Sequence, residues 1–491
     1  MRKRPPSPLA PRCNRSADMT LSQTFGEFAA HFPSAGMPPE VREAARWHMI
    51  DSIGVSIAGA NPKEESGAAF GRLVAQWAKG KGDVKAASLF GFDRQARAEL
   101  AALVNGSLAQ ALEMDDKHGS SLARPGSTVV PAVLAAAEAE GLSLAAAIDA
   151  AVVGYEVMIR LGFVAGDRFL ERGYHTSSLI GSFGVAAAIG RLRGATPAQI
   201  ADAMGIAGTF ASGIQESTRT GSTSKILHGG WGAHAGMLAI DLAMAGITGP
   251  DTVFEGKFGF FETHLTPITG QLDFARAAEG LGTRWYLPET AYKPYPCCQL
   301  LHAFIEASKQ VLADFARDGV TVAEIESVHC QLAEPGLTLV TEPRDRKKAP
   351  KTPHEGRFSL FFGVAAALVD GDVGLETFLS ERLDDDRILT LAQKIEASVD
   401  PESDYPAHCP ARLTVQAAGR RYFKHVPYHP GSPEAALSRA DVLAKFERNT
   451  RWHFGDGAVS VAEAMGETPE AESLSDMLRP IRAVETLRQA S

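Results

Sequence analysis

The sequence predicts a mainly α-helical fold, with a large all-helical domain and an inserted smaller α+β lid domain. From about residue 22 to residue 244, apolar residues recur at helical spacing. After Pro250 the pattern changes, and short segments of alternating apolar and polar residues occur. The chain of 491 residues also exceeds the ~250–300 at which a single hydrophobic core stops growing, so two domains are expected.

The first part of the chain holds helical patterns that are rich in Ala, Leu and Gly. Many of them are apolar around most of their circumference, which is typical of helices buried by other helices. The expected helices cover residues 41–58, 95–112, 129–139, 144–161, 177–191, 197–212 and 230–245. We therefore assign residues 19–284 to the helical domain.

The second part mixes strand and helix patterns. Strands are expected at 285–295, 325–332, 411–417 and 421–424, and helices at 301–315, 359–368 and 387–394. This mixture predicts an α+β lid domain at 285–425. Helical patterns at 439–446 and 459–465 then predict that residues 426–491 return to the helical domain. Residues 1–18 are basic and Pro-rich without the apolar core of a signal peptide, so a disordered tail is expected there.

The overall composition limits the kind of partner. A net charge of -9 argues against a nucleic acid or an anionic membrane surface. No run approaches the ~20 apolar residues that cross a bilayer, so no membrane is expected. The five cysteines lack CxxC spacing, and no HExxH motif occurs, so neither a metal nor another cofactor is indicated. Such low cysteine usage fits a reducing cytoplasm, which is the expected location.

An unusual cluster of ionisable residues lies inside apolar sequence. The chain reads Glu113-Met114-Asp115-Asp116-Lys117-His118 and then Arg124-Pro125-Gly126-Ser127. Ionisable groups in apolar surroundings are costly unless they are paired or used in function. This acidic block is therefore the first candidate for an active site, although an Asp-Asp pair by itself is more often a loop or a cap.

Three further segments are candidates. His175 precedes an apolar helix for which Thr176 or Ser177 is the expected N-cap, and a helix N-terminus favours anions. Lys225 lies before a Gly-rich helix start, where its charge can meet a carboxylate. Lys293 stands in a stretch stiffened by prolines, which also fits a simple domain junction. The S-x-x-K and G-x-G-x-x-A patterns at 222–225 and 230–235 lack their required companions, so they indicate nothing.

Together these segments resemble the MmgE/PrpD family, which includes 2-methylcitrate dehydratase, cis-aconitate decarboxylase and iminodisuccinate epimerase. The resemblance runs from about Leu21 to at least Phe446. It rests, in order, on Asp51-Ser52-Ile53-Gly54, Asn105-Gly106 through Asp116, Gly173-Tyr174-His175-Thr176, Lys225-Ile226-Leu227-His228, Gly246 to Pro250, Phe254-Glu255-Gly256, Lys293-Pro294-Tyr295-Pro296-Cys297 and Arg357-Phe358-Ser359-Leu360.

The resemblance implies a helical domain with a smaller lid domain, a homodimer, no cofactor and no metal. It also implies a catalytic set made of the acidic block with three distant residues. The catalytic residues would be Asp115, Asp116, His175, Lys225 and Lys293. Substrate-binding residues would be Lys117, His118, Arg124 and Ser127. Arg124 is a departure, because many members carry His at this position.

The chemistry implied for such a site acts on a carbon next to a carboxylate. His175 would be the principal acid/base, because imidazole carries protons near neutral pH. Lys225 and Lys293 would bind the carboxylates of a small polycarboxylate substrate and oppose the developing charge. A lyase, either a dehydratase or a decarboxylase, is the first hypothesis. An epimerase or isomerase is the second, and a non-catalytic binding protein is the third. Arg124 weighs against the best-known decarboxylase, because guanidinium cannot act as an acid at neutral pH.

Overall fold

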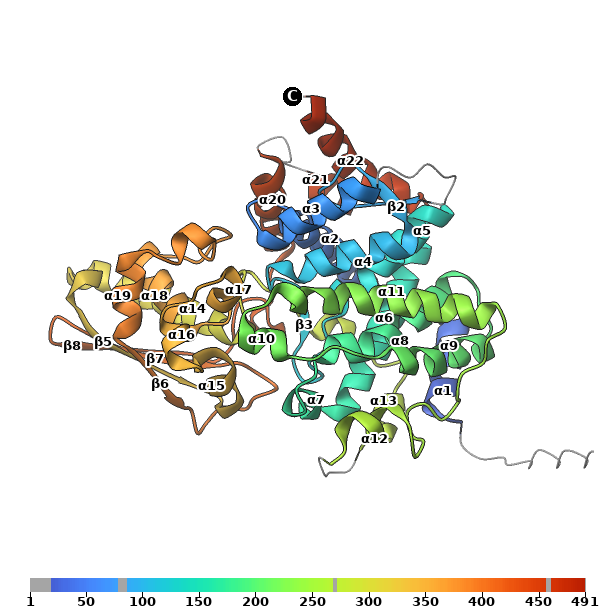
Figure 1. The fold of residues 1–491 in the computed structure, drawn as a ribbon, viewed down its shortest axis with the longest axis horizontal. Coiled ribbons are helices and arrows are strands. Elements are labelled where there is room, and N and C mark those ends of the chain that lie inside the picture. Colours follow the sequence, from blue (N-terminus) through green and yellow to red (C-terminus); the bar gives the residue numbers. More distant parts are fainter. Residues whose placement is uncertain (1–18, 78–85, 268–271, 456–460, 491) are drawn as a thin grey trace, which may run out of the picture.

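The computed structural model describes residues 19–77, 86–267, 272–455 and 461–490. The predicted tail at residues 1–18 lies outside this range. Most of the described chain is helical, which confirms a mainly α fold. Figure 1 shows two bodies side by side, one built from helices and one that holds the larger sheet. No helix in these ranges is both long and apolar enough to cross a membrane.

The larger body, here called the helical body, has one hydrophobic core that includes residues from Leu21 to Leu287 and from Val442 to Ile481. At its centre α8 packs against α6 and α11, and α11 also packs against α4. The helices of this body are α1 (Leu21–Ala30), α2 (Pro39–Gly59), α3 (Glu65–Trp77), α4 (Ala98–Ala111), α5 (Val129–Glu140), α6 (Leu144–Ala165), α7 (Arg168–Glu171), α8 (Thr176–Leu192), α9 (Pro197–Phe210), α10 (Glu216–Thr220), α11 (Leu227–Met244), α12 (Phe260–Leu265), α13 (Phe274–Ala278), α20 (Arg439–Phe454), α21 (Val461–Gly466) and α22 (Leu474–Ala490).

Glycines allow the central helices to approach closely. A Cβ atom on Gly230 of α11 would collide with the Leu103 carbonyl of α4, and one on Gly154 of α6 would collide with Val129 of α5. The Gly-rich pattern of the sequence therefore reflects contact between helix backbones.

The smaller body, here called the sheet body, has its own core from Tyr295 to Val426. Its sheet has the order β6-β5-β7-β8, in which β6 pairs parallel with β5 and the other neighbours are antiparallel. The strands are β5 (Ile325–Leu332), β6 (Ile395–Val399), β7 (Ala411–Ala417) and β8 (Arg420–Val426), and the helices are α14 (His302–Asp318), α15 (Glu334–Thr341), α16 (Arg344–Lys348), α17 (Pro353–Arg357), α18 (Leu360–Asp370) and α19 (Asp386–Gln393).

The burial of β7 alternates strictly along the strand, as its sequence predicts. In the Figure 1 view the C-terminal helices α20 to α22 lie beside α2 and α3 of the helical body. The chain therefore leaves the helical body, builds the sheet body and returns.

Two predictions on secondary structure are corrected. Residues 285–295 do not form a long strand; they form a short 3₁₀ turn (Leu287–Glu289) and the two-residue strand β4 (Thr290–Ala291). The Glu156 carboxylate accepts hydrogen bonds from the backbone amides of Tyr286 and Leu287, so these amides have no strand partner. The helix expected at 95–112 begins at Ala98, because β2 (Gln95–Arg97) pairs with β1 (Ala86–Ser88).

The short strand β4 positions the acidic block. It pairs antiparallel with β3 (Lys117–His118), with Lys117 opposite Ala291 and His118 opposite Thr290. The segment that leads into the sheet body is thereby joined to the acidic block, two residues before Lys293.

Candidate active site

The acidic block begins with a turn in which Glu113 adopts a positive φ of 55°. This conformation is uncommon for a residue other than glycine, and it is often found at functional sites. The turn directs the Glu113 carboxylate to Lys225, with which it forms a buried ion pair. Burial alone would raise the pKa of Glu113, but Lys225 and Lys293 outweigh burial and hold that pKa at about 2. Glu113 is therefore an anion at neutral pH.

Asp115 is held by a second buried network. Its Oδ1 lies 3.4 Å from Lys293 Nζ, and its Oδ2 accepts a hydrogen bond of 3.0 Å from Ser127 Oγ. Gln110 Nε2 donates to the same Asp115 oxygen over 3.3 Å and to Ser127 Oγ over 3.1 Å. Lys293 also donates to the Glu113 carbonyl over 3.2 Å. Lys293 thus fixes the acidic block from the segment that leads to the sheet body.

Asp116 is occupied by protein groups on both oxygens. The Gly126 amide donates to Oδ1 over 2.8 Å, the Tyr155 hydroxyl donates to Oδ2 over 2.7 Å, and His48 Nδ1 lies 2.9 Å from Oδ2. A Cβ atom on Gly126 would come within 2.7 Å of the carboxylate. Asp116 therefore holds the loop that carries Arg124, and its place in the structure suits positioning.

Arg124 and His175 meet directly. Arg124 Nη1 lies 2.8 Å from His175 Nε2, and His175 is the N-cap residue of α8. Burial, followed by the charges of Lys225 and Arg124, lowers the pKa of His175 well below its usual value. His175 is therefore neutral at pH 7, and Nε2 faces the guanidinium as an acceptor.

The N-terminus of α8 corrects the expected cap. Thr176 and Ser177 lie inside the helix, and within the described chain the hydroxyls of Thr176, Ser177 and Ser178 are buried without hydrogen-bond partners. Unpaired donors in the first turn of a helix attract anions. His175 thus stands at the anion-favouring end of a long buried helix.

A cavity of about 50 Å³ joins several of these residues. Four predicted site residues line it: Lys117, Arg124, His175 and Lys225. The sheet body contributes Cys298, Gln299, Leu300, Leu339, Phe358 and Tyr405. Asp115, Asp116, Ser127 and Lys293 are not among the lining residues. The cations thus come from the helical body, and much of the opposite wall is apolar.

The charges around this cavity do not balance. Lys225 is paired with Glu113 and Lys293 with Asp115. Arg124 and Lys117 form no ion pair with a carboxylate among the residues that the structure describes. Burial lowers the pKa of Lys117 to about 8, so its amine is still mostly protonated at neutral pH. Two positive charges therefore remain for a ligand, one on the buried Lys117 and one on the half-buried Arg124.

His118 lies outside this cavity. Its Nδ1 is 3.0 Å from Ser121 Oγ, and its Nε2 is 3.7 Å from Glu289. Successive residues of a strand point to opposite sides, so Lys117 and His118 face different spaces. The assignment of His118 to substrate binding therefore stays a prediction, and His118 would have to act from a different space than Lys117.

Glu113 is not among the predicted site residues, although its ion pair with Lys225 is central to the site. The cavity wall formed by Phe358 and Tyr405 was also missed. Phe358 lies in the Arg357-Phe358-Ser359-Leu360 motif, and its ring is 5.4 Å from Lys225 Nζ. Within the described ranges no cluster of His, Cys, Asp and Glu is arranged to hold a metal ion.

Comparison with known proteins identifies the family. The model of the MmgE/PrpD N-terminal domain matches residues 23–270, and that of the C-terminal domain matches residues 295–468. The chain belongs to the MmgE/PrpD family. Its N-terminal family domain carries Arg124, His175 and Lys225, whereas Phe358 and Tyr405 come from the C-terminal one.

Curated relatives of this MmgE/PrpD protein include cis-aconitate decarboxylases. The cis-aconitate decarboxylase-like protein oryM of Aspergillus oryzae is 29% identical over 77% of this chain and 80% of its own length. A cis-aconitate decarboxylase of Aspergillus terreus is 28% identical over 80% of this chain and 81% of its own. The human cis-aconitate decarboxylase is 24% identical over 77% of this chain and 79% of its own length.

Proposed function

We propose that this protein is a lyase that acts on a small di- or tricarboxylate by moving a proton at a carbon next to a carboxylate. Lys117 and Arg124, the two lining cations that have no carboxylate partner in the described chain, carry this proposal, because they line the same cavity as the neutral His175 and Arg124 contacts its Nε2. Two carboxylates of one substrate would neutralise them. The family membership and the names of the relatives support the same class of reaction.

Substrate binding would activate His175 through Arg124. The guanidinium now points one N–H at His175 Nε2, and a carboxylate is a stronger partner for it. When the substrate carboxylate binds Arg124, the His175 Nε2 atom becomes available as a base. The bound carboxylates also offset the cations that depress the pKa of His175, so the imidazole can hold the proton during the reaction.

Dehydration and decarboxylation share an enolate-like state in this site. In dehydration, His175 removes the proton from the carbon next to the carboxylate, and the hydroxyl group leaves as water after it takes up a proton from the imidazolium of His175. In decarboxylation, the C–C bond to the departing carboxylate breaks, and the electron pair moves to the carbon next to a retained carboxylate. For this route His175 must take up a proton once the bound carboxylates have raised its pKa, and its imidazolium then gives the proton that completes the product. Lys225 and Lys117 would oppose the enolate charge.

The same arrangement suits an epimerase as the second candidate. Arg124 stands beside the proton carrier and cannot itself protonate a leaving group, since its guanidinium remains charged. Epimerisation needs no leaving group. The relatives favour the lyase, and Arg124 favours the epimerase.

The sheet body would act as a lid. The cations of the cavity lie on the helical body, whereas Leu300, Leu339 and Phe358 of the sheet body face them. An open form could bind carboxylates on the cations, and closure would then exclude water and strengthen the electrostatic interactions. The proposal needs neither a metal nor an organic cofactor, because Lys and Arg supply the charge and His175 carries the proton.

A homodimer is part of the proposal. Leu227, Trp231 and Leu238 share one face of α11, and Leu227 and Leu238 are exposed, as is Ile247 beyond the helix. Apolar residues gathered on a surface helix are typical of a protein interface. Light scattering after gel filtration should give twice the mass of 52.2 kDa, and Leu238→Glu should reduce it to one copy. A monomeric wild type would overturn this part.

Proton NMR in heavy water tests the reaction class. The protein is incubated with 2-methylcitrate, citrate, cis-aconitate and iminodisuccinate in turn. A new olefin indicates dehydration, loss of carbon dioxide indicates decarboxylation, and deuterium in an unchanged skeleton indicates epimerisation. His175→Gln should lower the rate by roughly 10²–10⁴-fold. If no carboxylate reacts or exchanges, and none binds in calorimetry, the proposed function is wrong.

A further inference from the structure

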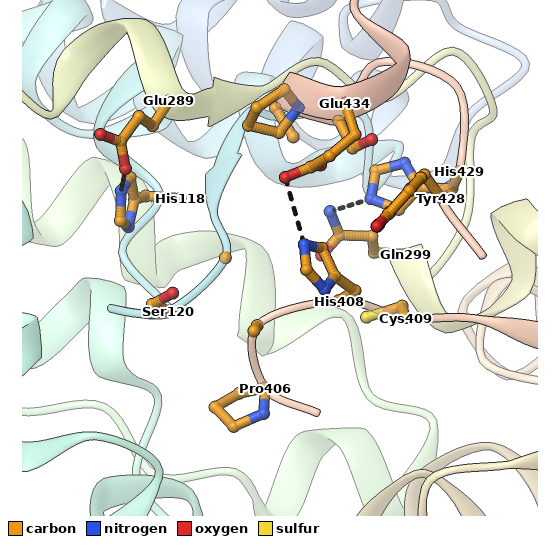
Figure 2. A pocket seen from close by; sticks show the side chains of 15 residues that line it. His118, Ser120, Glu289, Gln299, Pro406, His408, Cys409, Tyr428, His429 and Glu434 are labelled. Carbon is orange, nitrogen blue, oxygen red and sulfur yellow. Dashed lines mark hydrogen bonds and ion pairs between the residues drawn. The ribbon is translucent and has the colours of Figure 1, made fainter. Parts of the chain in front are cut away.

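A second and larger cavity lies next to the catalytic one. This outer chamber has a volume of about 270 Å³, and Gln299 lines both spaces. Figure 2 shows its polar lining, in which His118 faces Glu289 and His408 faces Glu434. His118 directly follows Lys117, which lines the catalytic cavity. The two spaces therefore adjoin each other at Gln299 and at the Lys117-His118 segment.

The outer chamber has the opposite charge character to the catalytic cavity. Glu289 and Glu434 stand at its exposed side, and burial keeps the pKa of His118 below its usual value. Partial burial would lower the pKa of His408, but its bonds to Asp404 and Glu434 outweigh burial and raise that pKa. Even with His408 charged, the carboxylates outnumber the cations here. A ligand that reached from one space into the other would meet cations first and acids second.

The buried end of the outer chamber presents an acceptor without a partner. His429 Nδ1 lies 3.0 Å from the Pro430 carbonyl, so Nδ1 must carry the proton. Burial lowers the pKa of His429 to about 4, so the ring is neutral and Nε2 is an acceptor. The Gln299 amide group that lies 2.7 Å from Nε2 must then be its NH₂ group. Gln299 Oε1 is left buried without a hydrogen-bond partner in the described chain, and the Gln299 side chain is only 5% exposed.

We infer that the outer chamber is a second subsite, which holds an amine-type hydrogen-bond donor at the far end of a carboxylate substrate. The inference rests on the proposed function, because the substrate carboxylates would bind Lys117 and Arg124. Gln299 Oε1 accepts the hydrogen bond from the amine, and Glu289 and Glu434 favour its positive charge. The catalytic cavity alone is small for a ligand site, whereas the two spaces together slightly exceed the ~300 Å³ at which such sites begin.

A matched pair of dicarboxylates tests the subsite. 2-(2-Aminoethyl)succinate carries an ammonium group where 2-propylsuccinate has a methyl group, and the rest of each molecule has the same length. Binding to the full-length protein is measured by calorimetry at pH 7. The ammonium compound should bind at least about tenfold more tightly, the size of one hydrogen bond to a charged group. Gln299→Met should remove most of this preference and leave the affinity for 2-propylsuccinate nearly unchanged.

Two further variants keep the test decisive if Gln299→Met does not fold. Glu434→Gln should weaken the ammonium compound alone, and Ser120→Trp should narrow the chamber and weaken both extended compounds while sparing succinate. Tyr428 lines the same chamber, and the variant Tyr428→Phe serves as the matched control. Equal affinities for the pair, or a preference that survives both Gln299→Met and Glu434→Gln, would overturn the subsite alone. If no dicarboxylate or tricarboxylate binds at all, the proposed function is overturned, and the subsite is overturned with it.

Discussion

Replacing Arg124 by alanine removes two effects of this side chain on catalysis at once. It removes the guanidinium that would bind a substrate carboxylate, and it removes the group whose Nη1 lies 2.8 Å from His175 Nε2. A hydrogen bond to a charged group contributes about 1.5–3 kcal/mol, so kcat/KM should fall by roughly 10- to 150-fold. Because the charge of Arg124 helps to lower the pKa of His175, its loss should raise that pKa.

The pH profile then distinguishes a catalytic role from a structural one. His175 must be neutral to act as a base, so the acidic limb of kcat/KM should move to higher pH in Arg124→Ala. In Arg124→Lys the charge remains and the planar fork is lost, so KM should rise while the acidic limb stays in place. Rates are measured by NMR in heavy water with the substrate found in the panel, and the exposed Arg421→Ala is the control. If Arg124→Ala changes neither KM nor the acidic limb, the coupling between Arg124 and His175 is refuted.

Three other predictions concern buried ionisable groups. Glu113→Gln leaves Lys225 buried without its anion, so urea unfolding should show that the free energy of unfolding falls by about 3–5 kcal/mol. A fall of less than about 1 kcal/mol would contradict the buried ion pair. Asp116→Asn should raise KM by disturbing the loop of Arg124 while the pH optimum stays constant; a shifted optimum would instead indicate proton transfer by Asp116. Burial lowers the pKa of His354 to about 4 in the folded chain, so below pH 6.5 the unfolded chain binds more protons than the folded chain does. The free energy of unfolding is therefore at its full value above pH 6.5 and falls by on the order of 3 kcal/mol as the pH drops to 4. His354→Gln should reduce this dependence of the free energy of unfolding on pH.

Much of the fold could be predicted because the hydrophobic pattern is local. The alternating residues of β5, β7 and β8 identify their strands, and the apolar helices α5, α6 and α8 are found close to the expected positions. Strand β6 was missed because its five residues follow α19 almost directly and its parallel partner β5 is far away in sequence. The prediction at 285–295 was wrong because a distant carboxylate, Glu156, binds the backbone amides.

The candidate site was only partly predictable. Residue type identified Lys117, Arg124, His175 and Lys225, and the structure places all four on one cavity. The separate positions of Asp115 and Asp116 depend on partners such as Tyr155, 39 residues further on, which no local pattern reveals. Adjacent residues therefore received the same role in the prediction although they contact different networks.

The paths between the two bodies have a consequence for protein engineering. Residues 288–294 lead out of the helical body and residues 427–438 lead back, and the Tyr292 amide donates to the Gly431 carbonyl over 3.0 Å where the two paths meet. The two points at which the sheet body joins the helical body are therefore adjacent in space. The sheet body of one relative could be grafted onto the helical body of another through these two junctions. Such a chimera would exchange one wall of the cavity and retain every cation on the other.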